Sequence, residues 1–217
     1  MDETDPLAAL PVLPQPRGAA VLGALLGRRS LSPRRLRPPG PAPEELRLMA
    51  QAAARAPDHG GLRPWRFRLV AGAARTALGE ACADALAADD PAAGPDRLQR
   101  EREKIAAGPC LVAVLAPLDP RRPDVPLPEQ HASTGAAILG FLLAAEAMGY
   151  AGIMLSGERV RRPALRAALG LADDVQLAGF LTIGTPGRAS AKALPAPPED
   201  LFGVIDDPAA LSSILRP

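Results

Sequence analysis

Aromatic residues are scarce in this chain, whose 217 residues include one tryptophan, one tyrosine and four phenylalanines. Alanine and leucine supply most of the apolar fraction, so the core must consist mainly of small and aliphatic side chains that favour helices. A chain of this length can bury a substantial core. We therefore expect one principal domain that is rich in helix.

Cysteine and histidine are also rare, with two residues of each. Cys82 and Cys110 stand alone in the sequence, outside any CxxC or Cys/His pattern with the spacing of metal ligands. The sequence therefore predicts no metal site, and it favours two reduced thiols.

Neither a strong net charge nor a long apolar run is present. The formal net charge is +1, which provides no global field for nucleic acid or a membrane surface. No apolar run is long enough to span a bilayer, and the first residues are acidic and rich in proline where a signal peptide would be apolar. We expect a cytoplasmic protein that binds neither nucleic acid nor membrane.

Several common catalytic fingerprints are missing as well. The chain contains no GxGxxG, no GxxxxGK(S/T), no GxSxG and no HExxH. These absences argue against a Rossmann dinucleotide site, a P-loop, a serine hydrolase elbow and a zinc protease. We therefore assign no catalytic nucleophile or triad.

The apolar pattern divides the chain into an arm and one domain. Residues 1–18 are rich in proline and lack clear periodicity, as is typical of an extended arm, and residues 19–217 form the domain. Helices are predicted at 19–27, 43–56, 73–88, 96–107, 129–148 and 161–169, and strands at 65–69, 110–116, 151–157 and 175–186. Strands separated by helices favour a mixed α/β or α+β layer structure.

The first candidate binding motif is the RRS triplet that follows the first predicted helix. Arg28 and Arg29 are paired guanidinium groups, Ser30 adds a hydroxyl, and Arg34 follows closely. This combination suits a phosphate, because planar guanidinium forks make bidentate, charge-assisted hydrogen bonds. The alternative is a solvated basic loop, since runs of charge commonly lie on the surface.

The second motif is RAPDHGGLRPWRF, residues 55–67, which concentrates Arg55, His59 and the only tryptophan in one connection. Two prolines restrict its backbone, and two adjacent glycines allow a close approach to a ligand. The sequence is compatible with a rigid binding loop. It is equally compatible with an irregular helix-to-strand connection whose Trp65 packs in the core.

The third motif is GIMLSG, where a predicted strand ends. Met154 and Leu155 offer soft apolar side chains next to Ser156, a combination that can cover one face of a flat ring. Ordinary packing in the core is the alternative for such a pair.

Together these motifs resemble the nitroreductase family, and most of all its minimal bacterial branch of single-domain FMN proteins. The resemblance covers residues 20–186 and rests on the RRS triplet, EEL at the start of the second helix, RAPDHGGLRPWRF, EQHASTGAAILGFLLAAEAMGYAGIMLSG and GFLTIGTP, in that order. It implies an α+β fold with a central, mainly antiparallel sheet wrapped by helices. It also implies an intertwined homodimer with two FMN sites at the subunit interface.

The resemblance assigns roles to the residues that match each motif. In the family, the first motif holds the ribityl phosphate and the pyrimidine end of FMN, the second reaches the flavin of the partner subunit, the third lines the flavin of its own chain, and the turn matching residues 144–149 accepts the nicotinamide. These roles correspond here to Arg28, Arg29 and Ser30, to Arg55 and His59, and to Met154, Leu155 and Ser156.

The implied activity is that of an FMN-dependent oxidoreductase. Hydride passes from NAD(P)H through the flavin N5 to a nitroaromatic, a quinone or another unsaturated small-molecule acceptor. A guanidinium near the flavin N1 and O2 would stabilise the anionic reduced flavin, a role that we assign to Arg55 or Arg34. Arg188 and Lys192 in the C-terminal tail are candidate partners of the phosphate.

The chain also departs from the family pattern. Close relatives tend to carry a large aromatic and a basic residue where this chain has Met154 and Leu155. Two further hypotheses therefore stay open. One is a non-catalytic protein that binds or stores flavin, and the other is an interaction module without a cofactor.

Overall fold

The computed structural model describes residues 16–187 and residue 201, so Arg188 and Lys192 lie outside the described residues. The helices are α1 (Pro16–Gly27), α2 (Pro43–Ala53), α3 (Gly72–Asp89), α4 (Pro95–Ala106), α5 (Leu127–Ala147), α6 (Glu158–Arg161) and α7 (Pro163–Ala168), and 3-10 turns lie at Pro33–Arg35 and His59–Gly61. The strands are β1 (Leu36–Arg37), β2 (Arg66–Leu69), β3 (Cys110–Pro117), β4 (Ala151–Leu155) and β5 (Val175–Pro186).

The strand β5 organises the sheet. The strands follow the order β1-β5-β3-β2, and β4 also pairs with β5. Every pairing is antiparallel, and β3 pairs with β5 from Cys110 opposite Ile183 to Pro117 opposite Val175. The predicted α+β fold with a mainly antiparallel sheet is therefore confirmed.

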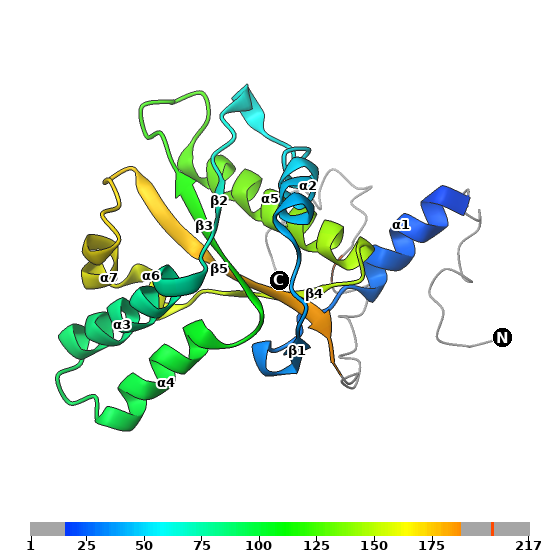
Figure 1. The fold of residues 1–217 in the computed structure, drawn as a ribbon. Coiled ribbons are helices and arrows are strands. Elements are labelled where there is room, and N and C mark those ends of the chain that lie inside the picture. Colours follow the sequence, from blue (N-terminus) through cyan, green and yellow to red (C-terminus); the bar gives the residue numbers. More distant parts are fainter. Residues whose placement is uncertain (1–15, 188–200, 202–217) are drawn as a thin grey trace.

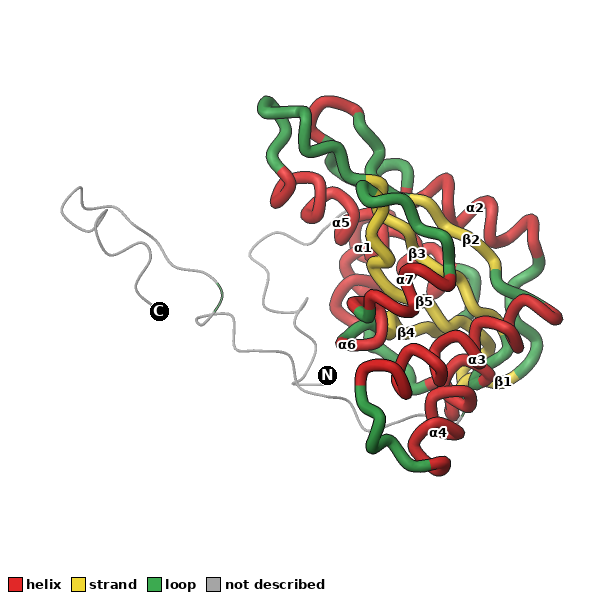
Figure 2. Tube along the Cα trace, turned by 90° about the vertical axis from the view of Figure 1, so that its left-hand side faces the viewer, coloured by secondary structure: helices red, strands yellow, loops and turns green. Residues whose placement is uncertain are grey.

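Helices cover both faces of this sheet (Figure 1). The helices α2 and α5 lie on one face, and α3, α4, α6 and α7 lie on the other. Figure 2 shows the strands between these two groups of helices. The arrangement gives the domain two cores, one on each side of the sheet.

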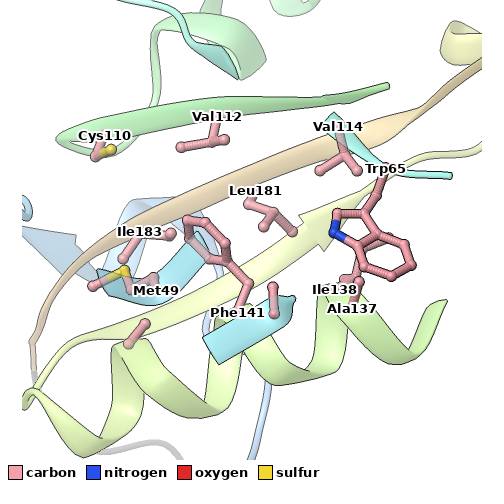
Figure 3. Packing of buried hydrophobic residues seen from close by; sticks show 12 residues of the cluster. Met49, Trp65, Cys110, Val112, Val114, Ala137, Ile138, Phe141, Leu181 and Ile183 are labelled. Carbon is pink, nitrogen blue, oxygen red and sulfur yellow. The ribbon is translucent and has the colours of Figure 1, made fainter. Parts of the chain in front are cut away.

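Alternation along β3 supplies side chains to both cores. Val112 and Val114 pack in the core under α2 and α5, whereas Leu111 and Ala113 pack in the core under α3, α4 and α7. Successive residues of a strand point to opposite faces, so a strand buried on both sides is apolar throughout. In the first core, Phe141 lies between α5 and the strands (Figure 3).

Two boundaries differ from the sequence prediction. The helix α1 begins at Pro16, within the segment predicted as an arm. The single helix predicted at 161–169 is wrong, because α6 and α7 are separate and Arg162 between them has extended backbone angles. Proline lacks an N–H and disfavours the helical conformation of the preceding residue, so Pro163 starts a new helix.

The segment that follows α1 runs beside β4. The backbone N–H of Leu31 donates to the carbonyl of Gly152 at 3.2 Å, which joins the RRS segment to the strand before Met154. At the other end of β4, Gly157 has a φ of 90°, and α6 starts directly after it. These connections bring the first and third motifs to the same edge of the fold.

Candidate functional site

The first pocket lies where the RRS segment meets the end of α5 and the start of β4. We call it the Arg28 pocket. It has a volume of about 280 Å³ and is lined by Arg28, Arg29, Leu31, Leu142, Glu146, Gly149, Tyr150, Ala151, Gly152, Pro186 and Gly187. The structure thus brings the two predicted phosphate-binding arginines together with part of the turn predicted to accept the nicotinamide. Ser30 is exposed and is not among the lining residues.

The second pocket lies at the other end of β4, and we call it the Met154 pocket. It has a volume of about 660 Å³ and is lined by Ser32, Pro33, Arg34, Arg100, Glu103, Lys104, Ala107, Met154, Leu155, Ser156, Gly157 and Arg159. The predicted flavin-lining residues and Arg34 therefore share one pocket. Cations from α4 and α6 complete it.

Sequence reasoning missed Arg100, Lys104 and Arg159. Arg100 and Lys104 are four residues apart, so they lie on one face of α4, which a helical pattern could have shown. Nothing in the local sequence places that face beside β4, however. The contact depends on the packing of α4 and α6 around the third motif.

A buried carboxylate holds two of these cations. Glu101 is 6% exposed. Its two oxygens accept hydrogen bonds from Lys104 Nζ and from Arg159 Nε, each at 2.7 Å. Burial raises the pKa of this carboxyl, but the hydrogen bonds from Arg159 and Lys104 outweigh that effect and lower the pKa to about 2. Glu101 is therefore ionised and ties α4 to the start of α6.

The second motif lies elsewhere. Neither Arg55 nor His59 is among the residues that line the two pockets. The His59 ring bonds to Glu129 near the start of α5, with Nδ1 and Oε2 separated by 2.7 Å. The Arg28 pocket lies at the opposite end of this helix of 21 residues, which is about 30 Å long. The chain thus does not bring His59 to its own Arg28 pocket.

The interior of the second motif is structural. Trp65 is 6% exposed and packs in the core under α2 and α5, as the alternative reading of the motif predicted. Thr134 Oγ1 donates to the Pro64 carbonyl at 2.7 Å, and the Arg63 N–H donates to Asp58 Oδ2 at 2.7 Å. These bonds hold the connection against α5 and leave Arg55 and His59 exposed.

The residues along β4 fit the FMN that the family resemblance implies. Arginines at one end suit a phosphate, and Met154 and Leu155 offer apolar surface for a flat ring. Arg159 has a side chain that is 10% exposed, and among the described residues only its Nε has a hydrogen-bond partner. This guanidinium retains Nη donors for a ligand of the Met154 pocket.

Two searches of the described residues returned nothing. Residues 16–187 and 201 contain no cluster of three or more His, Cys, Asp or Glu side chains suited to a metal ion. In the same part of the chain, no helix combines the length and the apolar character needed to cross a membrane.

Sequence comparisons give two curated relatives. The *Escherichia coli* (strain K12) protein named "Putative NAD(P)H nitroreductase YdjA" is 34% identical over 179 residues, which cover 81% of this chain and 93% of that protein. A *Haemophilus influenzae* protein named "Putative NAD(P)H nitroreductase" is 33% identical over 154 residues, covering 71% of this chain and 83% of that protein.

Solved structures share the fold. The nitroreductase-like family protein from Bacillus cereus has a TM-score of 0.75 at 23% identity, and the match covers 86% of this chain and 96% of that one. A mutant of the FMN and NADPH-dependent nitroreductase NfnB from sphigopyxis sp. strain HMH has a TM-score of 0.66 at 20% identity, covering 84% and 97%. The family model described as "Nitroreductase family" matches residues 25–185. The chain therefore belongs to the nitroreductase family.

Proposed function

We propose that this protein transfers a hydride from NAD(P)H, through bound FMN, to a nitroaromatic, a quinone or another unsaturated small molecule. Family membership and the NAD(P)H nitroreductase relatives make it an NAD(P)H-dependent oxidoreductase that uses FMN. The observation that carries the proposal for the site is the pair of pockets along β4, which joins a cationic end to an apolar surface.

FMN supplies the hydride chemistry when it is bound. In this proposal, Arg28 and Arg29 bind its phosphate through charge-assisted hydrogen bonds, and Ser30 adds a hydroxyl donor. Met154 and Leu155 cover the flavin ring and exclude water from it, while Ser156 offers a hydroxyl at the ring edge. The protein thus contributes orientation and electrostatics, and no side chain has to act as a nucleophile.

We also propose a homodimer in which Arg55 and His59 contact the FMN of the partner subunit. Both residues lie outside the two pockets of their own chain. Large apolar side chains are exposed on α1 and α5, among them Val21 at 60% and Leu139 at 42%. Such side chains favour burial against a second copy. Both cysteines are free thiols, which suits the cytoplasm as the proposed location.

The first experiment is an absorption spectrum of the purified protein, followed by identification of the released chromophore by mass. We expect FMN at about one per chain. The substitution Arg28→Ala should weaken FMN binding about tenfold, because it removes a charge-assisted contact to the phosphate. Arg121→Ala is the matched control, since Arg121 is 85% exposed and lies outside both pockets. Equal FMN content in wild type and Arg28→Ala would contradict the assignment.

A flavin-binding protein without turnover is the second candidate, and the apolar Leu155 in the Met154 pocket favours it. Stopped-flow mixing of the FMN-loaded protein with NADH or NADPH separates the two functions. An oxidoreductase bleaches the flavin absorbance faster than free FMN does under the same conditions. Bleaching no faster than free FMN would favour the storage protein.

A further inference from the structure

The Met154 pocket contains a pair of cations whose positions are set from below by a buried carboxylate. Lys104 and Arg159 come from different helices, yet both donate to Glu101 at 2.7 Å. A third cation, Arg162, has its Nη1 atom 3.9 Å from the same carboxylate. Glu101 therefore orients two cations toward the same pocket.

Each member of this pair keeps donors for a ligand. An ammonium group has three N–H donors, and Lys104 uses one of them on Glu101. Its side chain is 54% exposed and lines the pocket. Arg159 uses its Nε on Glu101, and its Nη groups have no hydrogen-bond partner among the described residues. The pair can thus bind an anionic group without giving up its contact to Glu101.

A purely structural ion pair on the same helix looks different. Glu80 of α3 and Arg102 of α4 also meet at 2.7 Å, but their side chains are 52% and 34% exposed and line neither of the two pockets. That pair joins two helices at the surface. By contrast, the buried Glu101 lies behind the residues that face Met154, Leu155 and Ser156.

We propose that Lys104 and Arg159, positioned by Glu101, form the anion subsite that stabilises the negative charge of reduced FMN. This inference rests on the proposed function and gives that role to α4 and α6 instead of Arg34 or Arg55. Glu101 is a positioning residue, because it acts through Lys104 and Arg159. The pair supplies positive charge beside Leu155, where close relatives tend to carry a basic residue.

The test measures how strongly apoprotein binds oxidised FMN and reduced FMN, together with the midpoint potential of the bound flavin. Lys104→Gln should weaken binding of reduced FMN about tenfold more than binding of oxidised FMN, because a charged hydrogen bond to the reduced form is lost. The midpoint potential should fall accordingly. Lys104→Arg should restore most of the difference. Glu80→Gln is the matched control and should change neither quantity.

Two results would overturn the inference. Equal weakening of both forms would show that Lys104 contacts a group whose charge does not depend on reduction, such as the phosphate. An unchanged ratio would show that Lys104 does not sense the flavin at all. Wild-type protein that binds no FMN would instead overturn the proposed function, so the two failures are distinguished by separate measurements.

A double-mutant cycle tests the positioning role of Glu101. In the Glu101→Gln background, Lys104→Gln should change the ratio of reduced to oxidised affinity by less than about twofold. A full effect of Lys104→Gln in that background would show that Lys104 needs no positioning by Glu101. The Lys104→Gln variant alone tests the anion subsite even where Glu101→Gln does not fold, because Glu101 then keeps its bond to Arg159.

Discussion

The two faces of the sheet are stabilised by different kinds of contact. The core under α2 and α5 is apolar, with Phe141, Met49 and Trp65 buried against β3 and β5. The face covered by α3, α4, α6 and α7 has an apolar core as well, but it also buries Glu101 and Arg159. Buried charge is costly unless it is paired. The difference indicates that the second face retains charge where a pocket can use it.

The largest expected effect is on the apolar face. Phe141→Ala removes a side chain that is 1% exposed, and the lost burial together with the cavity should lower the free energy of unfolding by about 4 kcal/mol. Urea denaturation followed by circular dichroism measures this change. Leu48→Ala on α2 is the control, since Leu48 is 53% exposed and should cost less than about 1 kcal/mol. A similar loss in both variants would contradict the location of the core.

The corresponding test on the charged face is Glu101→Gln. This substitution leaves Arg159 and Arg162 buried without their shared carboxylate, and we expect a loss of about 3 kcal/mol in the free energy of unfolding at pH 7. Glu80→Gln breaks an exposed pair on the same helix and should cost less than about 1 kcal/mol. If the two variants lose the same stability, the buried cluster is no more important than a surface pair.

The pH dependence of stability sharpens the same point. The pKa of Glu101 is lowered from 4.5 to about 2 in the folded protein, so its contribution is present above pH 4.5 and is lost as the pH falls toward 2. The wild type should lose about 3 kcal/mol more than Glu101→Gln across this interval. Urea denaturation of both proteins at several pH values measures the difference. A difference that does not change with pH would contradict the ionised, bonded carboxylate.

The smallest expected effect compares the two cysteines, one in each core. Burial raises the pKa of Cys110 under α2 and α5 to about 11, and burial likewise raises the pKa of Cys82 on the other face to about 11, despite the nearby Arg159. In the Cys82→Ala and Cys110→Ala variants, the remaining thiol should react with a thiol reagent at pH 8 only after unfolding. Rapid labelling of folded Cys82 alone would show that the charged face opens more readily.

Local pattern was sufficient for the elements that repeat one environment over many residues. The continuous apolar run of β5 predicted its bounds at 175–186, and β3 follows the same logic because both strands are buried on both sides. The helices α3, α4 and α5 match their predicted ranges to within two residues at each end. The two-residue strand β1 was not predicted, because so short a segment carries no periodicity of its own.

The candidate site divides in the same way. Composition and motif order were enough to predict the family and to select Arg28, Arg29 and Met154, because these residues lie in continuous segments of the chain. The grouping of Lys104 and Arg159 around Glu101 depended on the packing of α4 against α6, which joins residues 58 positions apart. Sequence periodicity describes one element at a time. The contact between two elements is set by side-chain packing and by the need to pair buried charge.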